Sequence, residues 1–146
     1  MASDPLPFSR VVTVRFDEGD PRGILFYGRV QELAHRVFEE FVVAELVARW
    51  EDWYLADDFI VPIRHAEATF HRPMRPGHAY EAQLSVTKVG ESSFEVRVRF
   101  VEVETLDPLV CAETRVSHVF ADPRRFQKIP IPSAFRSRLE AHLSRE

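Results

Sequence analysis

RFDEGDPRGILFY, residues 15 to 27, joins an alternating apolar segment to the longest helical pattern in the chain. Turn signals lie at Gly19-Asp20-Pro21 and at Gly23. Proline fixes its own φ and favours an extended backbone in the residue before it, so Asp20 should hold its carboxylate in one direction. Gly23 allows the backbone to come close to a bound group. The stretch therefore predicts a carboxylate on a tight turn directly ahead of a long helix.

The helical pattern runs from Tyr27 to about Arg49. A helix of about 22 residues would be roughly 33 Å long, and only a broad sheet could wrap around an element of that length. His35 and Glu39 are four residues apart and lie at one edge of the apolar stripe. The stripe recurs at three- and four-residue steps and consists of Val30, Leu33, Ala34, Val37, Phe38 and Phe41.

Five segments alternate between apolar and polar residues, as half-buried strands do. In the first segment, Phe16 is expected to face inward together with two valines. A short amphipathic helix follows the last segment, capped by Pro132-Ser133, with Phe135 and Leu139 inward. The five predicted strands are Ser9–Phe16, Ile60–Phe70, Tyr80–Val89, Ser93–Glu104 and Leu109–Phe120.

The order of these elements predicts the fold class. Residues 1–8 contain two prolines and are expected to form a loose arm. One strand, one long helix, four strands and a short helix follow, without an internal repeat or a linker. We predict a single α+β domain over residues 1–146, in which an antiparallel sheet of about five strands wraps around one long central helix.

The composition of the 146-residue chain excludes several classes of protein. Hydrophobic residues make up 45% and charged residues 29%, which is a globular balance. The net charge of −4 and the lack of a basic run give no indication of a nucleic-acid partner. No apolar stretch approaches the ~20 residues of a membrane span, and the first ten residues lack a signal-peptide pattern. The one cysteine, Cys111, precludes an internal disulfide and fits a reducing cytoplasm.

The position of Asp20 suits acyl-transfer hydrolysis. The first turn of a helix offers unpaired N–H groups that can hold an oxygen carrying developing negative charge. A carboxylate beside such groups can attack the carbonyl carbon or activate a water molecule that attacks it. A structural interpretation is also open, because an aspartate before proline often accepts hydrogen bonds from its own turn. The residues alone do not choose between the two.

Three segments resemble a known family. Asp20-Pro-x-Gly-Ile-x-Phe-Tyr27 resembles the signature of hot-dog-fold acyl-CoA thioesterases of the 4-hydroxybenzoyl-CoA thioesterase type. His65-Ala-Glu67…Phe70-x-Arg-Pro73…Gly77, and Ile129-Pro-Ile-Pro132 before a basic helix, resemble the same family, so the resemblance extends from about Arg10 to about Leu139. It implies the hot-dog fold, hydrolysis of a CoA thioester without a cofactor, and assembly into homodimers or homotetramers.

The resemblance also implies roles for residues of the turn and the helix. Asp20 would act on the thioester carbonyl as a nucleophile or as a base for water. The backbone N–H of Tyr27 would hydrogen-bond the thioester oxygen, and Gly23 would shape the turn between them. Some hot-dog thioesterases place their acid on the central helix, so Glu39 is a reserve catalytic residue. His35 and Glu39 resemble the branch that acts on 1,4-dihydroxy-2-naphthoyl-CoA, which favours an aromatic acyl group.

Each binding residue has a second, plainer interpretation. His35 and Glu39 could form a surface ion pair that contributes only about 0.3–0.5 kcal/mol. His65 and Glu67 share one strand face and either line the acyl pocket across a dimer interface or lie on the solvent face. CoA phosphates require cations, and the turn before Ser92 and Ser93 resembles a family segment that is basic in some members. The cationic candidates are Arg72, Arg75, Lys88, Arg124, Arg125 and Lys128.

Other chemistries lack their motifs. The chain contains no G-x-S-x-G, P-loop or G-x-G-x-x-G sequence. The six histidines show no metal-ligand spacing, so we expect no metal. Cys111 and His118 are expected in the core, His118 as a histidine whose hydrogen bonds are satisfied. Two alternative functions stay open: a hot-dog dehydratase or hydratase, which needs a histidine-containing dyad at another spacing, and a non-catalytic acyl-CoA-binding module.

Overall fold

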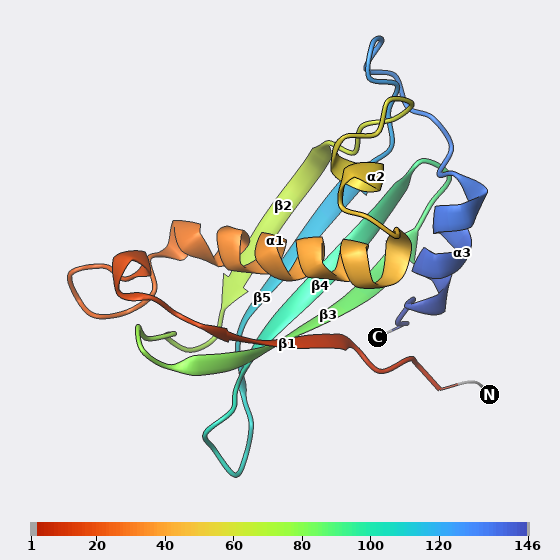
Figure 1. The fold of residues 1–146 in the computed structure, drawn as a ribbon. Coiled ribbons are helices and arrows are strands. Elements are labelled where there is room, and N and C mark those ends of the chain that lie inside the picture. The colour runs from red at the N-terminus through yellow and green to blue at the C-terminus, as the bar shows by residue number, and fades with distance from the viewer. Residues whose placement is uncertain (1–2, 146) are drawn as a thin grey trace.

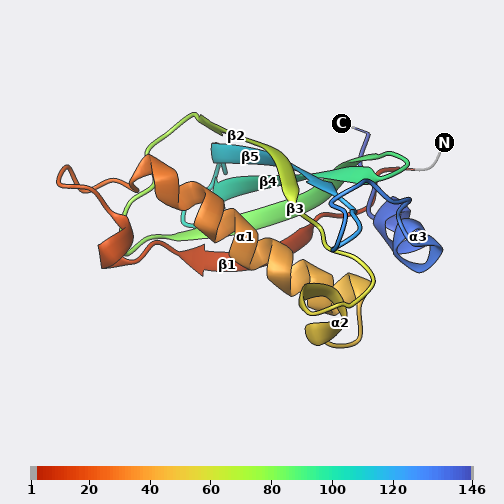
Figure 2. The same ribbon diagram turned by 90° about the horizontal axis from the view of Figure 1, so that it is seen from above.

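One antiparallel sheet and one long helix form the body of the protein. The computed structural model describes residues 3–145, and its five strands are arranged in the order β1-β3-β4-β5-β2. Helix α1 (Val30–Phe41) crosses one face of the sheet, and the view from above shows the other face without a helix over it (Figures 1 and 2). The strands are β1 Phe8–Thr13, β2 Ile63–Phe70, β3 Ala79–Val89, β4 Ser93–Glu102 and β5 Val110–Val119.

The central helix has three parts. A 3-10 turn at Tyr27–Arg29 leads into α1, and a π-helical turn at Val42–Leu46 follows it. All the residues of the predicted apolar stripe are buried, so the helix packs on the sheet through the predicted face. The predicted end at about Arg49 is wrong, because Val47 already has an extended backbone with φ −133° and ψ 162°.

Two short helices close the end of the central helix. Helix α2 (Glu51–Tyr54) is not among the predicted elements, and α3 (Ser133–Ala141) lies beside it (Figure 1). The Arg138 guanidinium of α3 donates a hydrogen bond to the carbonyl of Leu46, which satisfies an acceptor at the helix end. The expected side-chain cap of α3 is wrong, since Pro132 occupies the N-cap position without a side-chain hydrogen bond.

Aromatic rings fill the space between the helices and the sheet. Phe41 of α1 is fully buried, and its ring lies 5.5 Å from that of Phe8 in β1. The Trp53 ring of α2 lies 5.5 Å from Phe120 and 5.3 Å from Phe135 of α3, both edge-on. Edge-to-face pairs stabilise a core beyond the area that they bury. The many phenylalanines of the chain therefore contribute to one aromatic core that joins all the layers.

The first strand ends earlier than its alternation predicts. Phe16 does not continue β1 but begins a 3-10 turn, Phe16–Glu18, and is 94% exposed. The carboxylate of Glu18 accepts a hydrogen bond from the Arg15 N–H at 2.7 Å, while the Glu18 N–H donates to the Arg15 carbonyl at 3.0 Å. Because these bonds reverse the chain after β1, the inward position predicted for Phe16 is wrong.

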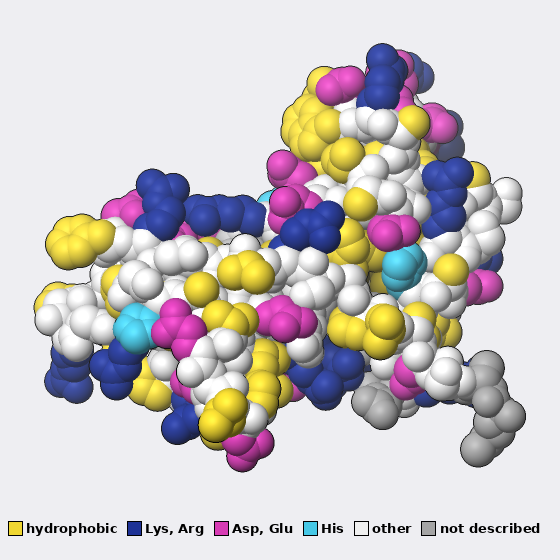
Figure 3. Space-filling model, turned by 60° about the horizontal axis from the view of Figure 1, so that its bottom comes forward, with side chains coloured by type: hydrophobic (Ala, Val, Ile, Leu, Met, Phe, Trp, Pro, Cys, Tyr) yellow, Lys and Arg dark blue, Asp and Glu magenta, His cyan; other side chains and the backbone are white. Residues whose placement is uncertain are grey.

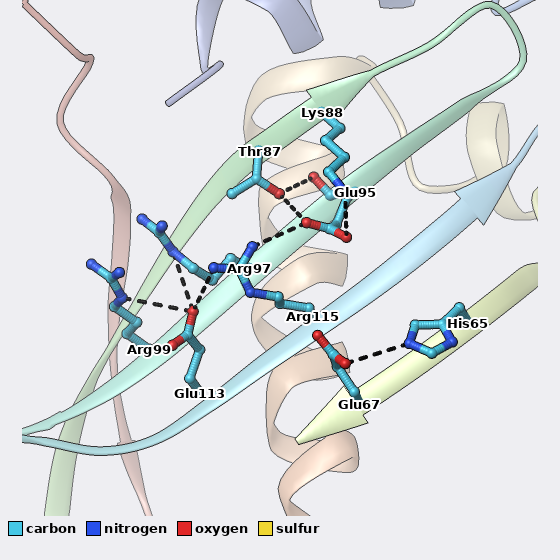
Figure 4. Close-up of polar contacts among 9 residues, drawn as sticks. All are labelled: His65, Glu67, Thr87, Lys88, Glu95, Arg97, Arg99, Glu113 and Arg115. Atoms are coloured by element: carbon cyan, nitrogen blue, oxygen red, sulfur yellow. Dashed lines mark hydrogen bonds and ion pairs between the residues drawn. The ribbon is translucent and has the colours of Figure 1, made fainter. Parts of the chain in front are cut away.

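The other strands lie where the alternation predicts them, with shorter ends. β2 starts at Ile63, because Pro62 has no N–H to donate, and Ile60 forms only an isolated bridge to Ala121. β4 ends at Glu102 instead of Glu104. Within β4 the predicted alternation is confirmed: Phe94, Val96, Val98 and Phe100 are buried on the side of the helix, and Glu95, Arg97 and Arg99 lie on the other face (Figure 4).

β2 forms one edge of the sheet. All eight of its residues are exposed, and its outer side has no strand partner among residues 3–145. At the other end of the fold, Asp4 of the N-terminal arm accepts hydrogen bonds from Ser144 and from the N–H of Arg145. Residues 1 and 2 of the arm lie outside the described residues. No helix within the described residues has the length and apolar character needed to cross a membrane.

The contrast between Phe41 and Phe16 gives a test of this packing. Phe41→Ala should lower the free energy of unfolding by about 3–5 kcal/mol, because it leaves a cavity in a closed core. Phe16→Ala is the matched control and should change it by less than about 0.5 kcal/mol, as an exposed side chain does. Denaturant unfolding of both variants measures this, and a comparable loss in the two would contradict the described orientation of Phe16.

Candidate active site

The Asp20 turn is a tight loop held by its own backbone. The Asp20 N–H donates to the Ile24 carbonyl at 2.8 Å, and the Gly23 N–H donates to the Asp20 carbonyl at 3.0 Å. Gly23 has a φ of +82°, and a Cβ built there would meet no atom within 4 Å. The glycine is therefore required by the left-handed backbone, and close approach of another group does not explain it.

The Asp20 carboxylate has one engaged and one free oxygen. Its Oδ1 accepts hydrogen bonds from the N–H groups of Arg22 at 2.8 Å and Ile24 at 3.4 Å. This is the structural interpretation offered by the sequence, and it is present. Oδ2, however, has no hydrogen-bond or ion-pair partner among residues 3–145, and the residue is only half-buried. The bonds to Oδ1 thus fix the direction of an oxygen that remains available.

A buried carboxylate joins this loop to the helix. Glu18 is 1% exposed; its Oε1 accepts from the Arg15 N–H, and its Oε2 lies 3.4 Å from Nη2 of Arg36 on α1. The Glu18 carbonyl accepts a hydrogen bond from the Phe26 N–H at 2.9 Å, which closes the loop. Glu18 therefore holds the turn and the helix start together. Sequence reasoning missed this residue, although an acidic residue two positions before Asp20 indicated a possible role in the turn.

The segment after β2 supports the loop from below. The Leu25 N–H donates to the Met74 carbonyl at 2.6 Å. A Cβ on Gly19 would lie 2.7 Å from Cγ of Pro76, so the loop can approach this segment only with glycine there. The sequence segment Phe70 to Gly77, which carried part of the family resemblance, is thus placed beside the turn that carried the rest.

The helix start beside the loop offers free donors. The N–H groups of Tyr27 and Gly28 have no acceptor in the part of the chain that the structure describes. The side chains of Phe26 and Tyr27 are exposed, and hydrophobic side chains project from this end of the molecule (Figure 3). A carboxylate oxygen and free amides at one end of a small loop can bind and polarise a carbonyl group.

A cavity of about 490 Å³ lies between α1 and the sheet. It begins at Gln31, about one turn beyond the helix start, and reaches Phe38. Gln31 also donates a hydrogen bond to the carbonyl of Glu67, which ties the helix to β2 at this point. The sheet contributes Ile63, Ala66, Val96, Val98, Thr114, Val116 and His118. Such an apolar space suits a flat hydrophobic group.

His118 lies in the wall of this cavity and is 4% exposed. Its ring stacks at 4.4 Å on Phe38 and at 4.9 Å on Phe94. Burial, and secondarily the nearby His35, lower its pKa to about 3, so the imidazole is neutral near pH 7. No described residue forms a hydrogen bond with this ring. The expectation of a core histidine is correct, but the expectation that its hydrogen bonds are satisfied is wrong.

The two helix candidates lie in different places. His35 is exposed and lines the cavity. Glu39 instead lines a shallow surface groove with Arg10, Glu40 and Trp50. No ion pair joins His35 and Glu39 within residues 3–145, so the plainer interpretation as a surface pair is not what the structure shows.

Comparisons with known proteins agree with this arrangement. Residues 14–139 match the family profile described as the thioesterase-like superfamily. The chain belongs to this superfamily.

Relatives and solved structures support the assignment. The chain is 28% identical over 120 residues to the 1,4-dihydroxy-2-naphthoyl-CoA hydrolase of Acaryochloris marina, which covers 82% of this chain and 86% of that protein. It is 28% identical over 130 residues to the enzyme of the same name from Nostoc punctiforme, covering 89% and 84%. A thioesterase superfamily structure from Jannaschia sp. CCS1 superposes with a TM-score of 0.83 at 24% identity, covering 99% of both chains. The expected hot-dog fold and the expected class of enzyme, a thioester hydrolase, are confirmed.

In this thioesterase, the side chains of His65 and Glu67 point away from the cavity. Both side chains lie on the outer face of β2, with His65 Nε2 3.6 Å from Glu67 Oε2 (Figure 4). Ala66 between them lines the cavity. Within one subunit they therefore do not touch the space where an acyl group would bind.

The phosphate-binding candidates fall into two groups at opposite ends of the sheet. Arg72, whose Nη1 lies 3.7 Å from Glu102 Oε2, and Arg75 follow β2 near the Asp20 turn. At the far end, a pocket of about 230 Å³ is lined by Ser92, Ser93 and Lys128 together with Glu91, Val119 and Arg64, a cation that sequence reasoning missed.

The remaining cationic candidates lie outside both groups. The N–H groups of Arg124 and Arg125 donate to Oδ1 of Asp122 at 2.8 and 2.9 Å, and their side chains stay exposed on the loop. Lys88 is 3.9 Å from Glu95 on the outer face. Burial raises the pKa of the Cys111 thiol to about 11, so this thiol stays protonated near pH 7. No group of histidine, cysteine and acidic residues suited to a metal ion occurs in the described chain.

The buried imidazole of His118 should make stability depend on pH. The unfolded chain takes up a proton at this residue below pH 6.5, whereas the folded chain does so only near pH 3. Between these values the unfolded state binds more protons, so stability falls with falling pH, by at most about 1.36 kcal/mol per pH unit.

Removing the imidazole should flatten this dependence. Unfolding in urea at pH 7.5 and pH 4.5 should show a smaller loss of stability for His118→Phe than for the wild type, since phenylalanine keeps the stacking but cannot titrate. His78→Phe, at an exposed histidine, serves as the control and should keep the wild-type slope. An unchanged slope in His118→Phe would contradict the buried, neutral state.

Proposed function

We propose that the protein hydrolyses an aryl-CoA thioester to the free acid and CoA, with Asp20 as the catalytic carboxylate. The observation that carries this proposal is the rigid Asp20 turn, with a free Oδ2, beside the free amides of Tyr27 and Gly28. The names of the relatives, and a structural neighbour titled gentisyl-coenzyme A thioesterase at 21% identity and a TM-score of 0.75, support an aromatic acyl group.

The chain's own residues can perform this chemistry in two ways. Oδ2 of Asp20 can attack the thioester carbon, form a mixed anhydride and release the CoA thiolate, after which water hydrolyses the anhydride. Alternatively, the carboxylate can take a proton from a water molecule as that water attacks. In both routes the Tyr27 N–H holds the carbonyl oxygen as it gains negative charge. Neither route requires a cofactor.

The acyl group would enter the cavity along α1. The cavity starts about one turn beyond Tyr27, so a carbonyl held at the helix start directs its substituent along the helix. Its walls are mostly aliphatic and aromatic, which suits a planar ring system. His35 at the rim would contact the ring edge, and Glu39, which lies in a separate groove, is not required for the reaction.

The phosphates of CoA would be held at the pocket formed by Arg64, Ser92, Ser93 and Lys128. Hydroxyl groups and cations together are typical of phosphate sites. This pocket and the Asp20 turn lie at opposite ends of β4, whose ten residues span roughly 34 Å. One subunit therefore does not place both parts of a CoA ester within reach of each other.

A two-fold dimer through β2 would resolve this separation. β2 runs from Ile63, at the end of the Ser92 pocket, to Phe70, at the end of the Asp20 turn. Pairing two β2 strands about a two-fold axis makes them antiparallel, so the Asp20 end of one subunit meets the Ser92 end of the other. It also satisfies the open edge of the sheet. We therefore propose a homodimer as the smallest active unit, in the cytoplasm.

The Asp20 carboxylate is tested by Asp20→Asn, which removes the charge and keeps the shape. We expect kcat to fall at least about 100-fold, or roughly 2.7 kcal/mol at 1.36 kcal/mol per decade, with little change in KM. Release of free thiol from a panel of aryl- and alkyl-CoA esters measures the activity. Turnover within a few-fold of wild type would remove Asp20 from the chemistry, and binding of the esters without thiol release by the wild type would favour a non-catalytic binding module.

The dimer is tested at Ala68. The His71 N–H donates to the Cys111 carbonyl, and backbone groups alternate in direction along a strand, so those of Glu67 face β5 and those of Ala68 face the open edge. Proline at this position therefore removes only an outward N–H. Light scattering at several concentrations should show a dimer for the wild type and for Ala68→Ser, which keeps the N–H. Ala68→Pro should shift the mass towards the monomer and lower turnover with it. A wild-type protein that is monomeric at every concentration would refute the shared site.

A further inference from the structure

We propose that His118 is a specificity-determining residue that hydrogen-bonds a polar substituent, such as a ring hydroxyl, on the part of the acyl group farthest from the thioester. The inference rests on the proposed function, because it assumes that the cavity along α1 receives the acyl group. It concerns a residue whose pattern in the sequence indicates only a core position.

The first observation is an unpartnered imidazole at the inner wall of a cavity. A neutral imidazole carries one N–H donor and one ring-nitrogen acceptor. The ring of His118 is 4% exposed and stacked on Phe38 and Phe94, yet no described residue bonds to either nitrogen. Neither ring nitrogen is among the fully buried polar atoms without a partner, so the imidazole reaches the space of the cavity. A ligand that fills the cavity and carries a hydroxyl would supply the missing partner.

The second observation is another unpartnered group on the same strand face. Thr114, Val116 and His118 alternate along β5 and all line the cavity. Thr114 is 1% exposed, and its Oγ1 has no hydrogen-bond partner. The two polar residues are four positions apart, or roughly 13 Å along the strand. Two orphaned polar groups in one otherwise apolar wall point to a ligand with polar atoms, since an empty apolar cavity would need neither.

The order along the cavity places His118 far from the thioester. Gln31 marks the end next to the helix start, and Phe38, on which His118 stacks, marks the other end. The two residues are seven positions apart, which corresponds to roughly 10 Å of helix. A ring system whose carbonyl is held by the Tyr27 amide therefore presents its distal edge to His118. A group without a hydrogen-bonding atom there would leave the imidazole unpaired in the complex, and such sites discriminate strongly against it.

Two substitutions of His118 test this inference, chosen because its ring stacks between two phenylalanine rings. His118→Phe keeps a flat ring between Phe38 and Phe94 and removes the donor and acceptor, while His118→Gln keeps a donor and an acceptor. If His118 served only to stabilise the core, its replacement by phenylalanine would make the protein less stable. If the imidazole is an orphan, the thermal midpoint of ligand-free His118→Phe should be no lower than that of the wild type.

The decisive measurement is the ratio of kcat/KM for hydroxylated and unsubstituted naphthoyl-CoA esters, with the hydroxyl placed at each ring position in turn. The wild type should prefer at least one hydroxylated ester by about tenfold or more. His118→Phe should reduce this preference to within about threefold, mainly by losing activity on that ester, and His118→Gln should recover part of it. An equal ratio in the wild type and His118→Phe would refute the role of His118.

Binding of the free acids separates this inference from the proposed function. Thermal shift with hydroxynaphthoic acids and naphthoic acid requires no hydrolysis. If the wild type hydrolyses none of the esters but binds the hydroxylated acid preferentially, and His118→Phe loses that preference, the hydrolase proposal fails and the role of His118 stands. If hydrolysis occurs but neither turnover nor binding depends on His118, the role of His118 fails and the hydrolase proposal stands.

Discussion

The burial of one face of α1 against a twisted sheet is the constraint on which the site depends. The aromatic contact between Phe41 and Phe8 anchors the helix on the side of β1. Because sheets twist and the helix is straight, the helix cannot touch all the strands equally closely. The space that remains lies towards β2 and β5, and it is the cavity lined by Ala66 and Val116. The packing that stabilises the fold therefore also creates the room for a ligand.

Buried polar groups of the described chain have partners on the outer face of the sheet, whereas two on the side of the helix have none. On the outer face, burial opposes ionisation of Glu95, but the hydroxyl of Thr87 and the cations of Lys88 and Arg115 outweigh it, and its pKa is lowered (Figure 4). Glu113 lies between Arg97, Arg99 and Arg115 in the same way. On the helix side, Thr114 and His118 have no such partners. The cavity therefore holds polar groups that a small molecule could complete.

Periodicity was sufficient to predict the helix, the five strands and their faces, because burial of one face imposes the period on the sequence. It could not predict that Phe16 would turn outward, since that depends on the buried Glu18 carboxylate capping the Arg15 N–H. Nor could it distinguish His118 from Val116, which occupies the same strand face. Alternation shows that a residue points inward, but not whether it meets another side chain or a cavity.

Alternation also does not show at which end of the sheet a loop residue lies, so the sequence analysis treated the basic residues of all the loops as one set of candidates. Antiparallel strands place successive loops at alternate ends of a sheet, so Arg72 and Arg75 lie with the Asp20 turn, while Lys128 lies with Ser92. The turn itself is held by Glu18 and Met74 of its own subunit. The carboxylate proposed for catalysis is thus preorganised within one chain, whereas the groups proposed for CoA lie at the far end. Under the proposed function, binding of the whole substrate, unlike positioning of the carboxylate, depends on the open edge of β2.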